Sequence, residues 1–223
     1  RALSRAPAAT QRFLREAQIA ARICDPHVVG IVDVGVQGTQ PYLVMEYVDG
    51  GSFRDLLGRH RTRRPPELIV SIVLDALSGL RAAHDLRDED GAPLRLVHGD
   101  VSPENMLVGL DGACKLSDFG VARAASEGAS ALLGKPAYFS PEHADRCAVD
   151  ARADLFSMGV VLWNALTGER LFDDATPEAT LANVRARPIP PPSTVGLHPP
   201  RCFDAVCLKA LGRNPEDRYQ SAE

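Results

Sequence analysis

Lysine and paired cysteines are scarce in this sequence, and this scarcity limits its chemistry. Only three lysines occur among 25 basic residues, and they are Lys115, Lys135 and Lys209. Any step that depends on lysine must therefore use one of these three side chains. The five cysteines contain no CxxC pair, so their spacing favours reduced thiols over a structural zinc site.

Long apolar segments and a strong charge imbalance are also missing. No apolar run approaches the ~18 residues that a membrane-spanning helix needs. The net charge of −4 gives no reason to expect nucleic acid or an anionic membrane as a partner. We expect a cytoplasmic protein, or the cytoplasmic domain of a membrane-anchored one, with enough length for one or two domains.

The spacing of apolar residues predicts a short mixed segment followed by a mostly helical remainder. An amphipathic helix is expected over residues 10–23, with Thr10 as its N-cap, and two strands over 28–36 and 41–48. Residues 49–51 then break the chain. The remainder predicts helices over 66–83, 154–167 and 202–211, short strands over 96–97, 106–108 and 114–117, and a surface loop or hairpin over 85–94.

Three short motifs carry most of the functional information. Residues 97–105 read Val-His-Gly-Asp-Val-Ser-Pro-Glu-Asn, residues 118–120 read Asp-Phe-Gly, and residues 140–142 read Ser-Pro-Glu. An aspartate that orients a hydroxyl, an asparagine five residues later and a second aspartate beyond it are the groups that phosphoryl transfer needs. In this order and spacing, the motifs resemble a protein kinase catalytic domain of the bacterial Ser/Thr class, and the resemblance covers essentially the whole chain.

The resemblance implies an α+β, protein-kinase-like fold of two lobes with the nucleotide between them. Residues 1–48 would be the remainder of the small lobe, with its C-helix and two strands, and residues 49–223 the mainly helical large lobe. Asp100 would be the catalytic base, while Asn105 and Asp118 would hold Mg²⁺ on ATP through oxygen ligands. His98 would be a packed structural residue.

Other positions resemble the nucleotide-binding residues of the family. Glu16 would be the C-helix glutamate that pairs with a strand lysine, and a solvated helix face is the alternative. The hinge-like segment that follows places Met45 as gatekeeper beside adenine, with the backbone of Glu46 and Val48 as its hydrogen-bond partners. Leu107 would close the adenine pocket from below.

Two further matches concern shape rather than chemistry. Residues 134–142 resemble the end of a kinase activation segment. Glu142 would form a bidentate ion pair with Arg218 that fixes the substrate platform. Asp154 would accept hydrogen bonds from the backbone of the catalytic loop.

The sequence also departs from the family pattern. It has no glycine-rich phosphate loop, and no lysine precedes Lys115. We therefore expect this polypeptide to bind Mg-ATP weakly, either as a fragment of a longer kinase or as a degenerate kinase. Gly99 replaces the arginine that precedes the catalytic aspartate in the family, and the only hydroxyl side chains over 121–133 are Ser126 and Ser130. Loop phosphorylation is therefore not expected to be the main switch.

A third departure is an exchange of two side chains. The catalytic-loop lysine of the family is Ser102 here, and the activation-segment threonine is Lys135. The exchange keeps one cation near the transferred phosphoryl group, where charge stabilisation matters most. We predict that Lys135 and Ser102 belong to the catalytic site of an active enzyme.

The predicted function is transfer of a phosphoryl group from ATP, with Mg²⁺, to Ser/Thr of a protein substrate. The alternatives are a pseudokinase that acts as a binding or scaffold module, and a small-molecule phosphotransferase of the same fold. The intact Asp100, Asn105 and Asp118 oppose the first alternative. The pairing of Glu142 with Arg218 opposes the second. The oligomeric state and the physiological substrate are left open.

Overall fold

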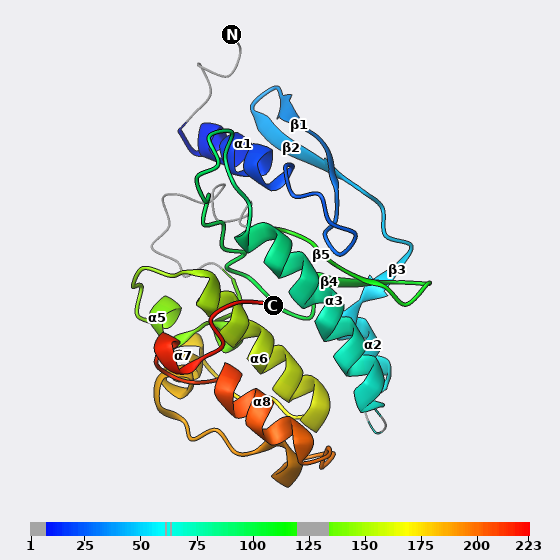
Figure 1. The fold of residues 1–223 in the computed structure, drawn as a ribbon, viewed down its shortest axis with the longest axis vertical. Helices are drawn as coiled ribbons and strands as arrows, with labels where there is room; N and C mark the ends of the chain where they lie inside the picture. Colours follow the sequence, from blue (N-terminus) through cyan, green and yellow to red (C-terminus); the bar gives the residue numbers. More distant parts are fainter. Residues whose placement is uncertain (1–7, 61, 63, 120–133) are drawn as a thin grey trace.

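The chain folds into a small upper part and a larger, helical lower part (Figure 1). The computed structural model describes residues 8–60, 62, 64–119 and 134–223. The upper part consists of helix α1 (Ala8–Ala20) and the antiparallel strands β1 (Ile31–Gln37) and β2 (Gln40–Met45). Helix and strand content agree with the expected α+β fold.

The lower part is built around two long helices, α3 (Pro66–His84) and α6 (Ala151–Thr167). Strands β3 (Gly50–Ser52), β4 (Met106–Gly109) and β5 (Cys114–Leu116) form a second sheet in that order. The other elements are α2 (Phe53–Arg59), η2 (Pro136–Tyr138), α5 (Pro141–Ala144), α7 (Pro177–Ala186), η3 (Pro192–Thr194), α8 (Cys202–Ala210) and η4 (Pro215–Asp217). Among the helices that the structure describes, none is long and apolar enough to cross a membrane.

Helix α6 is the buried centre of the lower part. Every residue over 153–167 is buried, which confirms the helix expected from the apolar run there. The Asp150 side chain accepts a hydrogen bond from the backbone N–H of Arg152 and so caps the first turn. Gly168 ends the helix with a φ of 79°, a conformation that glycine adopts easily.

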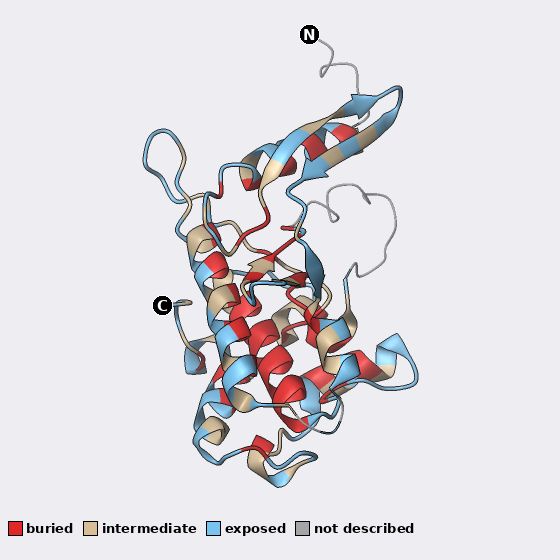
Figure 2. Cartoon of the chain, turned by 90° about the vertical axis from the view of Figure 1, so that its right-hand side faces the viewer, coloured by how far each residue is buried: buried red, intermediate tan, exposed pale blue. Residues whose placement is uncertain are grey.

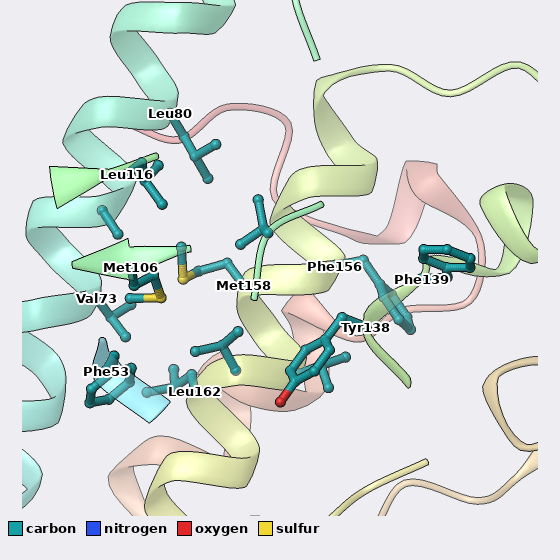
Figure 3. Packing of buried hydrophobic residues seen from close by; sticks show 14 of the residues in the cluster. Phe53, Val73, Leu80, Met106, Leu116, Tyr138, Phe139, Phe156, Met158 and Leu162 are labelled. Atoms are coloured by element: carbon teal, nitrogen blue, oxygen red, sulfur yellow. The ribbon is translucent and has the colours of Figure 1, made fainter. Parts of the chain in front are cut away.

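Burial is concentrated in the lower part, whereas β1 and β2 have no fully buried residue (Figure 2). Core side chains of both long helices meet the sheet between them. Figure 3 shows Val73 and Leu80 of α3 beside Met106 of β4 and Leu116 of β5, with Met158 of α6 facing them. The motif over 97–105 ends just before β4 and the motif over 118–120 begins just after β5, so this packing positions the candidate site.

The first predicted elements differ from the structure at their ends. Helix α1 begins at Ala8 and ends at Ala20, so Thr10 lies inside the helix and is not its N-cap. Alanine is the best helix former, which favours the earlier start. The first strand begins at Ile31 rather than at Val28, because Val28 instead bridges to Leu116 of β5.

The expected chain break at 49–51 is also wrong. Gly50 and Gly51 pair with Gly109 and Val108 as part of the β3–β4 ladder. A β carbon on Gly50 would lie 2.0 Å from the carbonyl oxygen of Val108. The close approach of the two strands therefore requires glycine at this position.

Two predictions between α3 and the catalytic loop had different outcomes. The hairpin expected over 85–94 is confirmed, since Arg87 bridges to Pro93 and the Asp88 N–H donates to the Ala92 carbonyl at 2.9 Å. The strand expected over 96–97 does not form, and this segment has no regular structure.

Candidate active site

Asp154, in the first turn of α6, holds the catalytic loop in place. Its Oδ2 accepts a hydrogen bond from the backbone N–H of His98 at 2.9 Å, and its Oδ1 accepts one from the N–H of Gly99 at 2.9 Å. Nε2 of His84, at the end of α3, lies 2.8 Å from the same Oδ2. The role expected for Asp154 is confirmed, and both long helices fix the loop.

His98 is a packed structural residue, as expected. Its side chain is fully buried, its Nε2 lies 2.9 Å from the carbonyl oxygen of Ser117, and its ring lies 4.5 Å from the ring of Phe119. The backbone N–H of Asp100 donates to Nδ1 at 3.3 Å. Because both ring nitrogens already have hydrogen-bond partners, His98 is not available as a general base.

Asp100 is oriented by Asn105 from the same loop. The Asn105 amide donates to the backbone carbonyl of Asp100 at 2.8 Å and to its Oδ2 at 3.0 Å. The other carboxylate oxygen, Oδ1, faces Gly134, where a β carbon would lie only 3.0 Å away. Glycine at this position, with a φ of 109°, keeps one side of the carboxylate open.

Lys135 reaches the catalytic loop, as the sequence exchange predicts. Its Nζ donates to Oγ of Ser102 at 2.8 Å and lies 3.8 Å from Oδ2 of Asp100. Ser102 is fully buried, whereas the Lys135 side chain is 34% exposed. The fold therefore gathers an ammonium, a hydroxyl and a carboxylate at one point.

Asn105 and Asp118 lie at neighbouring strand ends. The backbone N–H of Ser117 donates to the Asn105 carbonyl at 2.9 Å. Asp118 follows directly, with an exposed side chain and a φ of 62°, which is uncommon for aspartate and is found at functional sites. Across the described ranges no group of three or more His, Cys, Asp and Glu could hold a metal. An amide and a carboxylate nevertheless fit Mg²⁺, which binds one or two protein oxygens together with substrate phosphates.

The hinge-like segment is tied to the lower part through Glu46. Its backbone N–H donates to the Gly30 carbonyl at 2.7 Å, and its carboxylate accepts a hydrogen bond from Lys115 of β5, which lowers the pKa of Glu46. None of the described residues hydrogen-bonds to the backbone N–H of Val48. The contact of this N–H with adenine stays a prediction.

Glu16 pairs with an arginine of its own helix rather than with a lysine. Nε of Arg12, one turn earlier, donates to Oε1 of Glu16 at 2.9 Å. Lys115, the first lysine of the sequence, lies at the hinge instead. Met45 is exposed and Leu107 half-buried. Their contacts with adenine stay predictions, as does a lysine partner for Glu16.

The ion pair expected between Glu142 and Arg218 is confirmed. Nη1 donates to Oε1 at 2.8 Å and Nη2 to Oε2 at 2.7 Å. The Arg218 side chain is fully buried, and its bidentate contact joins the end of the activation segment to the C-terminal segment. Residues 121–133, with Ser126 and Ser130, lie outside the described residues.

Glu104 and Arg54 are neighbours of this cluster that the motifs did not identify. Glu104 accepts a hydrogen bond from Arg54 of α2, 50 residues earlier, and its Oε2 lies 3.6 Å from Nζ of Lys135. Both line a groove of about 390 Å³ that also includes Gly134 and Tyr138. In the sequence, Glu104 is recognisable only as a member of the Pro-Glu-Asn motif. The spacing of residues does not indicate that Arg54 and Lys135 are its partners.

The chain matches a family model described as a protein kinase domain over residues 2–220. It is 40% identical over 235 residues to the serine/threonine-protein kinase PknB of Mycobacterium leprae, which covers 99% of this chain and 35% of the relative. It is 36% identical over 228 residues to the tyrosine-protein kinase MasK of Myxococcus xanthus, which covers 99% of this chain and 35% of the relative. The chain thus spans about a third of the length of these curated relatives.

A solved structure has a similar fold. The crystal structure of the Mycobacterium tuberculosis PknI kinase domain, a mutant form, matches with a TM-score of 0.72 and 26% identity, covering 99% of this chain and 77% of that chain. The family match extends over nearly the whole sequence, and the fold brings the motif residues together. The chain therefore belongs to the protein kinase domain family.

Proposed function

We propose that a protein containing this chain transfers the γ-phosphoryl group of ATP to a serine or threonine hydroxyl of a protein substrate. The observation that carries the proposal is the cluster in which Asn105 orients Asp100 at 3.0 Å and Lys135 lies 3.8 Å from the same carboxylate. We place the small lobe in residues 1–48 and the large lobe in residues 49–223, with the nucleotide between them.

The proposed roles follow from the positions of the charged groups. Asp100 accepts the proton of the acceptor hydroxyl while the hydroxyl oxygen bonds to the γ-phosphorus. The bond from that phosphorus to the oxygen shared with the β-phosphate breaks, and ADP keeps the electron pair. Lys135 stabilises the negative charge on the transferred group. Mg²⁺, when held by Asn105 and Asp118, neutralises phosphate charge.

A protein substrate is favoured over a small molecule by the built platform beside the base. The groove of about 390 Å³ runs over α2, the catalytic loop and α7, and is open along one side. Beyond the groove, Glu142 and Arg218 join the segment that follows η2 to the C-terminal segment through two hydrogen bonds. An extended peptide suits such a groove, whereas a small molecule would not need the anchored platform.

A tyrosine hydroxyl is the second candidate acceptor, because the relative MasK is named a tyrosine-protein kinase. Serine or threonine is favoured because the sequence Pro103-Glu104-Asn105 matches the Ser/Thr form of the loop.

The test is phosphate transfer from radiolabelled ATP to peptides that carry a single Ser, Thr or Tyr, by a purified protein containing residues 1–223. We expect Asp100→Asn and Asp118→Asn each to abolish transfer to Ser and Thr peptides, with thermal melting unchanged. Asp90→Asn, an exposed aspartate of the 85–94 hairpin, is the matched control and should keep full activity. Transfer that survives either active-site change, or that goes only to tyrosine, would contradict the proposal.

A further inference from the structure

Glu104 lies between two cations that come from different parts of the fold. Its Oε1 accepts a hydrogen bond from Nη1 of Arg54 on α2. Its Oε2 lies 3.6 Å from Nζ of Lys135, which precedes η2. The carboxylate therefore connects α2, the catalytic loop and the end of the activation segment.

The surroundings of Glu104 keep it charged and directed at Lys135. Oε2 is buried, and no described residue gives it a hydrogen bond. Burial is the largest influence and raises the pKa of Glu104, but the hydrogen bond from Arg54 and the charge of Lys135 outweigh it, so that the pKa is lowered. A buried carboxylate oxygen without a hydrogen bond is costly unless a cation is near. Lys135 is the cation found at this oxygen.

Lys135, in turn, needs a second carboxylate to hold its position. Lysine carries a compact charge on a flexible four-carbon stem, and its hydrogen bond to Ser102 is to a neutral group. Its Nζ lies 3.8 Å from Asp100 and 3.6 Å from Glu104, so the two carboxylates attract it about equally. Without Glu104, the ammonium would move onto Asp100 and occupy the carboxylate that the acceptor hydroxyl must reach.

We infer that Glu104, anchored by Arg54, is a positioning residue that holds the Lys135 ammonium beside Asp100 without a full ion pair between them. This inference rests on the proposed function, because it matters for turnover only if Lys135 acts in phosphoryl transfer. It also gives Arg54 a role, since the guanidinium fixes one oxygen of Glu104 and leaves the other for Lys135.

The contact itself can be tested without activity, because the chain has only three lysines. In ¹⁵N-lysine-labelled protein at mildly acidic pH and low temperature, ammonium groups held in ion pairs exchange slowly and give proton–nitrogen NMR signals. We expect a Lys135 signal, assigned by its absence in Lys135→Thr, that changes its chemical shift in Glu104→Gln because the ammonium moves from Glu104 onto Asp100. The Lys115 signal, held by Glu46, should persist in both variants.

The functional role is tested by a double-mutant cycle in peptide phosphorylation. Glu104→Gln should lower kcat about 10- to 100-fold with little change in the peptide KM, since a misplacement of about 1 Å can cost this much. Because Glu104 acts through Lys135, Glu104→Gln should cause no further loss in a Lys135→Thr background. Glu216→Gln, which also removes a carboxylate from an arginine, Arg152, is the matched control and should be unaffected.

Three outcomes decide the inference. A Lys135 signal unchanged in Glu104→Gln, or losses that add fully in the double variant, would overturn it. If the wild-type protein transfers no phosphate to any peptide, the proposed function fails, and the NMR comparison alone decides whether Glu104 holds Lys135. A shifted Lys135 signal in Glu104→Gln together with a non-additive loss of kcat supports both.

Discussion

Strands β1 and β2 are among the least buried elements of the molecule, and helix α6 is the most buried helix described. In the two strands no residue is fully buried, and Val32 is 71% exposed. In α6 every residue over 153–167 is buried, and Phe156 is fully buried. The hinge that would meet adenine therefore continues from an exposed pair of strands. The catalytic loop and the proposed peptide platform instead rest on a core helix.

This difference in burial indicates where substitutions near the site can be tolerated. A two-stranded sheet is marginal by itself and depends on what packs against it, here mainly α1. The partly buried Ile31, Val34 and Leu43 of the two strands pack against the core. Helix α6 instead holds Asp154 and, through its neighbours, the Glu142–Arg218 pair. We expect changes on the platform side to cost folding free energy or turnover, and changes on the exposed strand faces to cost little.

The largest expected effect is loss of the pair that anchors the platform. Glu142→Ala and Arg218→Ala should each lower the free energy of unfolding by about 3–5 kcal/mol, because each leaves a buried charge without its partner. The double change should cost much less than the sum of the two. Urea denaturation of the four proteins measures the coupling. Additive losses would mean that the two side chains do not interact in solution.

The next effect concerns catalysis on the same platform. Lys135→Thr should lower kcat about 100-fold, as removal of one transition-state charge contact typically does. Ser102→Lys combined with Lys135→Thr restores the ordinary family arrangement and should recover much of this loss. Lys209→Thr, a lysine that lies over the ring of Tyr219, is the control. A fully active Lys135→Thr enzyme would falsify the exchange.

A smaller effect is expected from acid. Burial is the largest single influence on Glu142 and raises its pKa. The hydrogen bonds from Arg218 and the other lowering contributions together exceed this rise, so the folded-state pKa lies below the usual value. At pH values above the unfolded-state pKa of about 4.3, a lowered carboxyl pKa stabilises the fold. This stabilisation is lost as the pH falls through the folded-state pKa.

We therefore expect the free energy of unfolding to decrease as the pH falls below about 5. Glu142→Gln should make this decrease shallower, even though the variant is less stable at neutral pH. Denaturation curves measured at a series of pH values test the slope. An unchanged slope would show that Glu142 does not contribute to acid sensitivity.

The smallest effect compares one chemical change in the two regions. Val32→Thr, on the exposed strand face, should change the unfolding free energy by less than about 0.5 kcal/mol. Val160→Thr, at a fully buried position of α6, should cost about 1–3 kcal/mol because it buries a hydroxyl in an apolar environment. Equal costs at the two positions would remove the contrast between the regions.

Local patterns in the sequence determined much of this protein. Asp100 and Asn105 are five residues apart, so one loop brings them together, and their hydrogen bond follows from that spacing. The apolar run over 154–167 predicted a buried helix because no face is left for solvent. The errors were local as well: Thr10 is not a cap, and Gly50 and Gly51 form a strand rather than a break.

Contacts between distant segments were decided only by the tertiary structure. The sequence suggested that Lys135 and Ser102 had exchanged roles, but their 2.8 Å contact depends on packing that brings together positions 33 residues apart. The bond from Arg54 to Glu104 spans 50 residues and has no motif. Spacing along the chain specifies which residues are neighbours within a loop or a helix. Neighbours that are far apart in sequence depend instead on how the buried faces of α3 and α6 pack. That packing placed Glu104 between its two cations.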